Sequence, residues 1–197
     1  MAEKNRPGAM AYPKKGSLNR FTYKLPLLLW RLGFGPVLSH PTRGGKKMMV
    51  VTTFGRKSKL PRHTMVSQIS FNHRDYVISG WWRQADWIKN FHEDSLVTIQ
   101  SGGRIYSAHA KRVEDLDEIR GVARSLFDSG GDSHFGAWLD ALEIEPNLND
   151  LIKKREQIYF VGFDPTEIIG PDPLSADLIW IWAVLISLTL GLLFFLW

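Results

Sequence analysis

Short runs of apolar and polar residues, separated by turn-forming residues, fill the chain from residue 48 to residue 113. Runs rich in β-branched and aromatic residues and bounded by Gly, Asn, Asp or Pro are typical of β-strands. Five such runs, together with a sixth at residues 157–162, have mostly short connections and predict a mainly β fold, an antiparallel sheet closed into a small barrel with flanking helices. The predicted strands are Met48–Thr53, His63–Phe71, Tyr76–Ser79, Leu96–Gln100, Arg104–Val113 and Gln157–Gly162.

Helical spacing is found in three other segments. Residues 85–92 place Trp87 and other apolar side chains on one side of a helix, and residues 115–127 form a charged amphipathic helix that Asp115 caps, with Glu118 at its third position. The carboxylates at 114–118 are expected to form a solvated face. Residues 18–32 resemble a helix interrupted by Pro26, which packs on the domain, on a bilayer, or on both. A turn is predicted at residues 72–75.

The C-terminal 20 residues, 178–197, contain no charged side chain. At about 1.5 Å per residue they extend roughly 30 Å, the thickness of the hydrocarbon core of a bilayer. The pattern predicts a single-pass transmembrane anchor, preceded by a short, stiff linker over residues 163–177 with three prolines. Because no export signal precedes the domain over residues 18–162, we expect that domain on the cytoplasmic side of the membrane.

Charge is distributed unevenly along a chain of net charge +5. The first 62 residues hold 14 Lys or Arg and one acidic residue, and residues 1–17 read as a flexible basic tail. A basic half indicates phosphate groups on a ligand, a lipid or a nucleic acid. Nucleic acid fits poorly, because basic and aromatic residues are not interleaved in a recognisable motif.

Several kinds of chemistry are disfavoured by residue content. The absence of cysteine excludes disulfides, thiolate metal sites and cysteine nucleophiles. The six histidines show no paired ligand spacing, so no metal site is predicted. No nucleophile elbow or Ser/His/Asp set is present, and no catalytic residue is assigned.

A basic loop follows the first predicted strand. In TTFGRKSKLPRHT, residues 52–64, Gly55 permits a tight bend before Arg56, Lys57, Ser58 and Arg62. Guanidinium, ammonium, hydroxyl and free backbone N–H groups together suit a phosphate. On spacing alone, a phosphate site and a solvated basic turn remain equally good interpretations.

A second segment, SGWWRQADWIKN at residues 79–90, contains three tryptophans. These side chains offer a platform for a flat ring, or one or two of them are ordinary core residues.

With these two segments the sequence resembles the deazaflavin-dependent nitroreductase family, whose members use coenzyme F420. The family pattern of an apolar strand, Gly-Arg-Lys-Ser-Gly and Pro-Arg-x-Thr is matched by VVTTFGRKSKLPRHT, and its Gly-Trp, Asp-Trp and Asn pattern by SGWWRQADWIKN. The hairpin SGGRIYSAHAKRV and the segment RLGFGP are also similar to family segments. Lys59 stands where the family usually has Gly.

The resemblance implies a split β-barrel of the flavin-reductase type that binds reduced F420. It implies that Arg56, Lys57, Ser58 and Arg62 hold the phosphate and acidic tail of the coenzyme. Residues lining the deazaflavin ring would be Thr64, Met65, Ser79, Gly80 and Trp87.

The function expected from this resemblance is that of a membrane-anchored oxidoreductase. It would pass a hydride from reduced F420 to an electron-poor acceptor, a membrane quinone or a nitro compound. Two alternatives stay open: a barrel protein that binds FMN, and a non-enzymatic, membrane-tethered module that binds polyanions.

Overall fold

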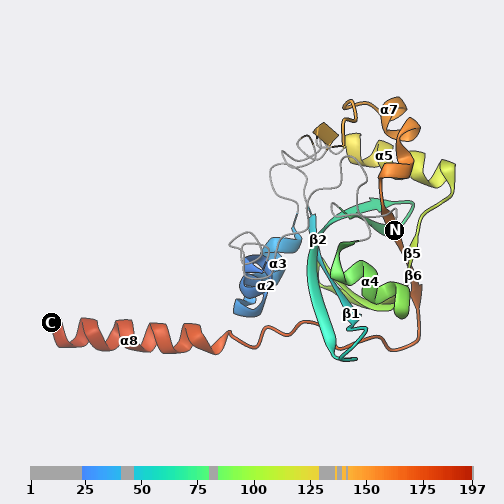
Figure 1. Cartoon of the computed structure of the whole chain (residues 1–197). Coiled ribbons are helices and arrows are strands. Elements are labelled where there is room, and N and C mark those ends of the chain that lie inside the picture. Colours follow the sequence, from blue (N-terminus) through green and yellow to red (C-terminus); the bar gives the residue numbers. More distant parts are fainter. Residues whose placement is uncertain are drawn as a thin grey trace.

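A six-stranded barrel forms the body of the protein, in a computed structural model that describes residues 24–40, 47–79, 84–128, 136, 139–140 and 142–196 (Figure 1). The strands close in the order β1-β2-β3-β6-β5-β4, and every neighbouring pair is antiparallel. The predicted antiparallel barrel with flanking helices is therefore confirmed. Its strands are β1 (Lys47–Phe54), β2 (Pro61–Phe71), β3 (Arg74–Ile78), β4 (Leu96–Ser101), β5 (Arg104–Arg112) and β6 (Phe160–Thr166). The predicted basic tail, residues 1–17, lies outside the described residues.

The last strand differs from its prediction. It was expected at 157–162, but β6 begins at Phe160 and continues through Pro165 to Thr166. β3 pairs with β6 only as far as Gly162, whereas β5 pairs with it to Thr166. Beyond Gly162, β6 thus has a free edge where the missing N–H of a proline costs no ladder hydrogen bond.

The turn between β2 and β3 is shorter than the predicted four residues. Asn72 and His73 have φ of 48° and 61°, and strand pairing resumes at once between Phe71 and Arg74. Two central residues with positive φ are typical of the type I′ turn, whose twist matches that of an antiparallel hairpin.

Helix α4 (Asp86–Glu93) closes the interior of the barrel. Its buried Trp87, Ile88 and Phe91 pack in one apolar cluster with inward-facing strand residues such as Val51 and Phe163. The predicted helix at 85–92 is confirmed. The position of α4 matters for the site because α4 contacts β1, and Asn90 of α4 donates to Thr53 near the end of that strand.

Two further helices cover an outer face of the barrel. In a second cluster, α5 (Leu116–Asp128) and α7 (Leu148–Lys153), followed by the 3₁₀ helix η3 (Arg155–Gln157), pack on outward-facing residues including Ile69 and Phe160. Asp115 caps α5 as predicted, because its Oδ1 accepts the Glu118 N–H at 2.8 Å.

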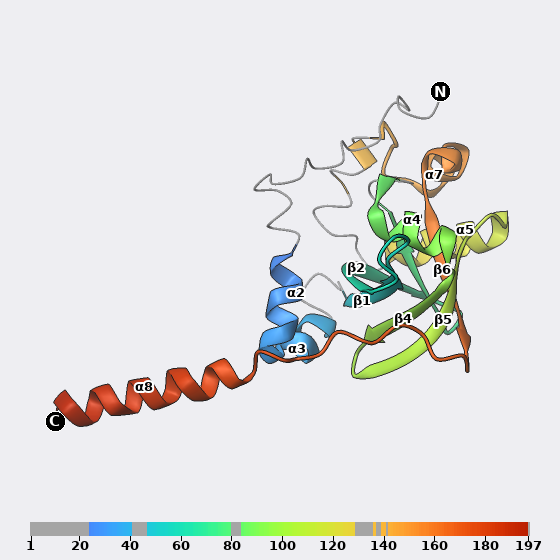
Figure 2. The same ribbon diagram turned by 60° about the horizontal axis from the view of Figure 1, so that its bottom comes forward.

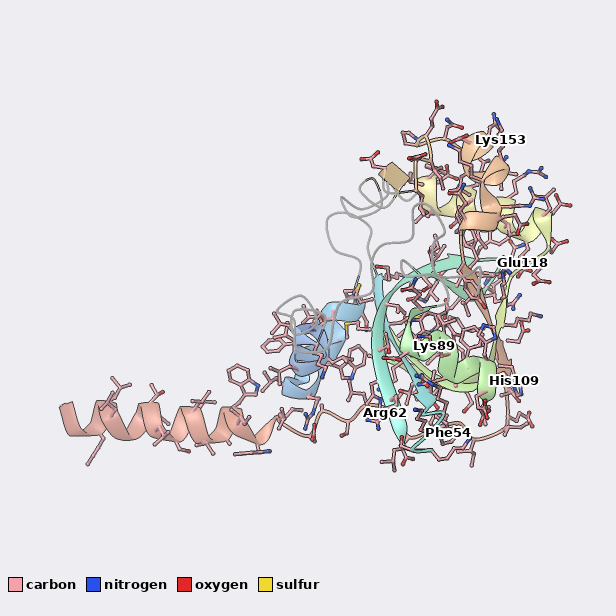
Figure 3. The ribbon with its side chains drawn as sticks, in the orientation of Figure 1. Phe54, Arg62, Lys89, His109, Glu118 and Lys153 are labelled. Atoms are coloured by element: carbon pink, nitrogen blue, oxygen red, sulfur yellow. The ribbon has the colours of Figure 1, made fainter. Side chains whose placement is uncertain are left out.

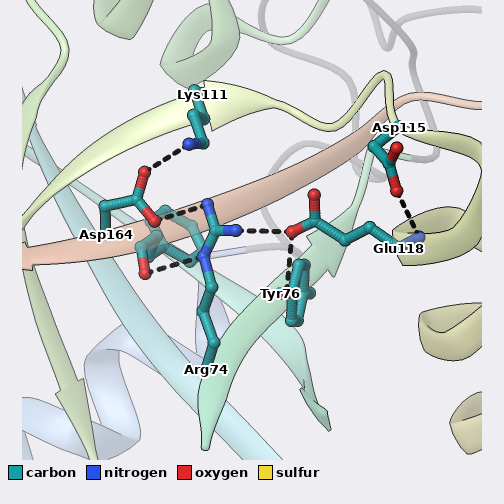
Figure 4. Close-up of polar contacts among 7 residues, drawn as sticks. Arg74, Tyr76, Lys111, Asp115, Glu118 and Asp164 are labelled. Atoms are coloured by element: carbon teal, nitrogen blue, oxygen red, sulfur yellow. Dashed lines mark hydrogen bonds and ion pairs between the residues drawn. The ribbon is translucent and has the colours of Figure 1, made fainter. Parts of the chain in front are cut away.

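The Glu118 side chain, however, does not belong to a solvated face. It forms an ion pair with Arg74 and accepts a 2.8 Å hydrogen bond from the Tyr76 hydroxyl (Figure 4). Arg74 also pairs with Asp164 at 2.7 Å, so β3, β6 and α5 are joined through one guanidinium. Burial, followed by the hydrogen bond to Glu118, raises the pKa of Tyr76 to about 12.

The N-terminal helical unit, residues 25–39, comprises α2 (Leu25–Leu29), the π-helical turn η1 (Trp30–Phe34) and α3 (Gly35–Ser39). Of the predicted helix at 18–32, residues 18–23 lie outside the described residues. Pro26 does not interrupt a helix, because it sits in the first turn of α2, where a missing N–H has no cost. The unit packs through α2 on β2 and through α3 on β1.

The segment expected as a linker, residues 163–177, is bound to the barrel. Its first residues belong to β6, and the remainder, which we name the strap (residues 167–177), crosses β4. Thr98 Oγ1 donates to the Pro171 carbonyl at 2.6 Å, and the Gln100 amide exchanges two hydrogen bonds with the Leu174 backbone at 2.7 and 3.0 Å. The strap thereby fixes where the C-terminal helix leaves the body.

Helix α8 (Trp180–Leu196) follows the strap and points away from the barrel (Figures 1 and 2). Among the described helices, none combines the length and the apolar character needed to cross a membrane. The predicted transmembrane helix over 178–197 is therefore not found. α8 begins only at Trp180, and its 17 residues extend about 26 Å, short of the roughly 30 Å of a hydrocarbon core.

Candidate functional site

The loop between β1 and β2 is a compact turn that projects its cations outward. The Gly55 N–H donates to the Leu60 carbonyl at 2.9 Å, and the Lys59 N–H donates to the Gly55 carbonyl at 2.7 Å. A Cβ on Gly55 would lie 2.6 Å from Ser58 Oγ, so only glycine lets the loop close this tightly. Lys59 adopts a φ of 55°, which explains why glycine suits this position in related sequences.

Helix α4 holds the first cation of this loop. Both Arg56 Nη atoms lie 3.4 Å from Asp86 Oδ1, and the Arg56 backbone N–H and Nη1 each donate to Asn90 Oδ1 at 3.3 Å. Buried Asn90 also donates to Thr53 Oγ1 at 3.0 Å. The two segments singled out in the sequence are therefore in direct contact.

Sequence analysis missed Asp86 and Asn90 as partners of the basic loop. Their spacing of four residues places them on one face of a helix. A carboxylate and an amide on one helical face, in a chain whose basic loop has no acidic residue of its own, were the signal that could have identified these partners.

The remaining cations of the loop are open to solvent. Lys57, Ser58, Lys59 and Arg62 are all exposed, and Arg62 Nη2 donates to Ser58 Oγ at 3.1 Å. No carboxylate from the described part of the chain pairs with Lys57, Lys59 or Arg62. The loop therefore has a surplus of positive charge and a hydroxyl at one end of the barrel. Figure 3 shows Arg62 and Phe54 at this end, opposite Lys153 of α7.

Thr64 and Met65 are both half-buried in β2. Because successive strand residues face opposite sides, their side chains point to different faces of the sheet. Thr64 shares its face with Arg62 and with Val66, which packs on the barrel core, whereas Met65 shares the outer face with His63. Only Thr64 therefore presents its side chain on the same face as the Arg62 guanidinium.

The predicted ring-lining residues near α4 are mostly covered. Trp87 is 5% exposed and belongs to the barrel core, 5.8 Å from the Phe91 ring. Ser79 is buried, and its N–H donates to the Tyr159 carbonyl at 3.0 Å. Gly80 lies outside the described residues. The structure thus gathers the four loop residues and Thr64, while Trp87 lies beneath the surface.

His63, on the outer face of β2, is adjacent to the N-terminal helical unit. Its Nδ1 lies 2.9 Å from Thr52 Oγ1. Burial lowers the pKa of His63, and the nearby positive charge of Arg31 lowers it further. The neutral form of the His63 imidazole is therefore favoured at the contact between the N-terminal helical unit and β2.

Among the described residues, no group of three or more His, Asp or Glu side chains is arranged to hold a metal ion. The exposed charged side chains of the basic loop are hydrogen-bond donors, and donors of this kind bind anions.

Comparison with solved structures gives distant likenesses. A structure described as an F420H2-dependent reductase, FDR-A, shares 13% identity and a TM-score of 0.45, with 59% of this chain and 93% of that chain covered. A conserved hypothetical protein from Mycobacterium tuberculosis shares 13% identity and a TM-score of 0.42, with coverages of 66% and 76%. A putative 5-nitroimidazole antibiotic resistance protein from Bacteroides thetaiotaomicron shares 9% identity and a TM-score of 0.42, with 61% of this chain and 73% of that chain covered.

Among curated proteins, none matches the chain. The family model described as F420H2-dependent quinone reductase does match, over residues 36–149, which is more than half of the chain. The match includes the basic loop, α4 and five of the six strands. The chain therefore belongs to the F420H2-dependent quinone reductase family and is an oxidoreductase that uses coenzyme F420.

Proposed function

We propose that this enzyme reduces a quinone carried in a lipid bilayer, and that α8 attaches it to that bilayer. The observation that carries this proposal is α8 itself, a helix without a charged residue, most of whose described apolar side chains are exposed. An exposed apolar surface of this kind marks an interaction site, and lipid is the partner that suits a helix apolar on all sides.

The basic loop fits the anionic part of the coenzyme, which bears a phosphodiester and glutamate carboxylates. We propose that Arg56, Lys57, Ser58 and Arg62 bind this part, because the loop has surplus positive charge and exposed donors. Asp86 and Asn90 hold Arg56 so that its guanidinium stays at the edge of the barrel.

Bound in reduced form, the coenzyme supplies a hydride to an electron-poor acceptor. The task of the chain is then to orient the ring and exclude water. We propose that Thr64, Ser79 and Gly80 border the ring, and that Met65, whose side chain points to the opposite face of the sheet, contributes only its backbone to this border. Trp87 supports this border from the barrel core, where it is packed against Phe91.

A quinone dissolved in lipid is the acceptor that an enzyme attached to a bilayer through α8 would meet. Attachment confines the active site near the bilayer and raises the effective concentration of a lipid-borne acceptor. The N-terminal helical unit packs on β2, the strand that carries Arg62 and Thr64, and so joins α8 to the coenzyme site. We place the barrel on the cytoplasmic side, where anionic lipids attract the basic first 62 residues.

The test follows oxidation of reduced F420 by the full-length protein with liposomes that contain menaquinone, and separately with a short-chain, water-soluble quinone. A variant with Leu188→Lys and Leu192→Lys, both exposed on α8, weakens attachment without touching the barrel. We expect the native protein to use both quinones, and the variant to retain only the soluble one.

Two results would reject parts of the proposal. Turnover of a nitroaromatic without turnover of any quinone rejects the quinone acceptor. Recovery of the native protein in the supernatant after sedimentation of the liposomes rejects attachment through α8.

A further inference from the structure

The N-terminal helical unit, residues 25–39, is apolar but poorly covered. Arg31 is its single charged residue. No residue of α2 or η1 is buried, and Leu25, Leu28, Phe34 and Val37 are exposed, Val37 by 66%. An apolar helical segment in a water-soluble fold normally buries one stripe against its own core. This unit touches the barrel and still leaves much of its apolar surface open.

The charge of Arg31 is neutralised by the base of α8. Arg31 Nε and Nη2 donate to the two carboxylate oxygens of Asp177 at 2.7 and 2.6 Å, a paired geometry that is among the strongest available to these groups. The Leu178 N–H donates to the Arg31 carbonyl at 3.0 Å. The Arg31 guanidinium holds the pKa of Asp177 below its usual range, so this carboxylate stays ionised at neutral pH.

Aromatic and backbone contacts extend the same junction. Trp182 Nε1 donates to the Leu32 carbonyl at 2.8 Å, and the Trp182 and Phe34 rings meet edge to face at 5.7 Å between centroids. Gly33 has a φ of 96°, and a Cβ there would lie 3.1 Å from Ile179. The unit and the first turn of α8 are thus joined by an ion pair, two hydrogen bonds and close packing.

We propose that the N-terminal helical unit is a second lipid-contacting surface, joined to α8 through Arg31 and Asp177 so that both enter the same bilayer face. This inference rests on the proposed attachment of α8 to lipid. With two lipid-contacting surfaces, the barrel is held at the membrane in one orientation, with β2 toward the lipid. Attachment through α8 alone would leave this orientation free.

The arrangement in space supports lipid as the occupant. Figures 1 and 2 both show α2 and α3 between the barrel and the start of α8. A bilayer that receives α8 must therefore approach the unit. Trp180 and Trp182, at the end of α8 nearest to the unit, are exposed and suit the boundary between headgroups and acyl chains.

The absence of cysteine from the chain allows a direct test. Full-length protein with Val37→Cys or Leu28→Cys is labelled with the polarity-sensitive dye NBD. Lys153→Cys, at the far end of the molecule in Figure 3, is the control. Vesicles of phosphatidylcholine and phosphatidylglycerol, with or without spin-labelled lipids, are then added. We expect a blue shift and strong quenching at residues 28 and 37, and neither at residue 153.

A second pair of variants tests the junction. In the Val37→Cys background, Asp177→Asn removes the charge that pairs with Arg31, and Asp172→Asn removes an exposed charge of the strap as a matched control. We expect both proteins to float with vesicles, while only Asp177→Asn loses quenching at residue 37.

The outcomes separate this inference from the proposed function. If the native protein does not float with vesicles, attachment through α8 is wrong and this inference falls with it. If it floats while residues 28 and 37 stay unquenched, only the second surface is wrong. A blue shift at residue 37 that rises with protein concentration before any lipid is added shows that a second copy covers the unit, which also overturns the inference.

Discussion

Two arginines of this protein, Arg74 and Arg56, stand in contrasting surroundings. The Arg74 side chain is 19% exposed, pairs with Glu118 and Asp164, and donates to the Phe163 carbonyl. Lys111 joins the same cluster through Asp164, so two cations meet two carboxylates (Figure 4). The Arg56 side chain is 35% exposed, and its contacts with Asp86 are 3.4 Å long.

The difference separates a structural cluster from the loop that we propose as the coenzyme site. Around Arg74 the charges balance, and its guanidinium links β3 to β6 and α5. Around Arg56 three further cations gather, and Asp86 is the acid that pairs with the loop within the described residues. Surplus donors at an exposed edge are available to an anion.

The largest effect is expected from Arg74→Ala. It leaves Glu118 and Asp164 without their shared partner, and we expect a loss of about 3 kcal/mol in the free energy of unfolding. Chemical denaturation followed by tryptophan fluorescence measures this loss. Lys111→Ala, at a side chain that is 58% exposed, is the control and should cost less than about 1 kcal/mol. Equal losses in both variants would mean that the cluster is not centred on Arg74.

Arg62→Ala should show the opposite behaviour. We expect the free energy of unfolding to stay nearly unchanged, while F420 binding weakens by about 1.5–3 kcal/mol, roughly 10- to 150-fold in Kd. Titration of coenzyme fluorescence measures Kd. Arg120→Ala, which removes an exposed cation from α5, is the matched control. An unaltered Kd in Arg62→Ala would remove this residue from the site.

Lys59 combines a cation with a strained backbone, so substitutions there separate charge from conformation. Both Lys59→Gly and Lys59→Ala remove the charge, and both should weaken F420 binding to a similar extent. Because glycine accepts a φ of 55° without penalty, Lys59→Gly should be about 1 kcal/mol more stable than Lys59→Ala.

The matched control for Lys59 lies in the β2–β3 turn, at a residue with a φ of 61°. His73→Gly compared with His73→Ala should show the same difference in stability and no change in Kd. A Kd that follows backbone strain rather than charge would contradict the assignment of Lys59 to an electrostatic role.

The smallest effect concerns pH and His63. Its pKa in the folded protein is lowered, so the unfolded chain takes up a proton at a higher pH than the folded chain does. The free energy of unfolding should therefore fall as pH decreases below about 6.5 and level off below the folded-state pKa. His63→Gln should remove this dependence. Denaturation at a series of pH values checks the sign, and a native protein that gains stability on acidification through this range would contradict it.

The barrel was predictable because each of its strands carries a local signal. Alternating β-branched and apolar residues set the strands, and Asn72 marked a turn, so topology followed from short connections. The basic loop was predictable for a similar reason, since its residues are adjacent in the sequence. The cap of α5 by Asp115 also depends only on neighbours.

Contacts between distant segments were not predictable in this way. Arg56 and Asp86 are 30 residues apart, and Arg74 and Glu118 are 44 apart. No local sequence pattern indicates which strand a helix will cover, so Glu118 was wrongly predicted to be solvated. The strap was missed because its hydrogen bonds to the barrel use backbone carbonyl and N–H groups, which do not distinguish one residue type from another.

The strap also determines how the protein responds to force. A pull along α8 first loads the contacts of Trp182, Leu178 and Asp177 with the N-terminal helical unit. It then loads the bonds of Leu174 to Gln100, and after them those of Pro171 to Thr98 and of Gly170 to Ser107. Because these contacts bear the load one after another, they break in sequence, and each break needs only a low force. We therefore expect the strap to detach and extend under tension before the barrel and its basic loop are disturbed.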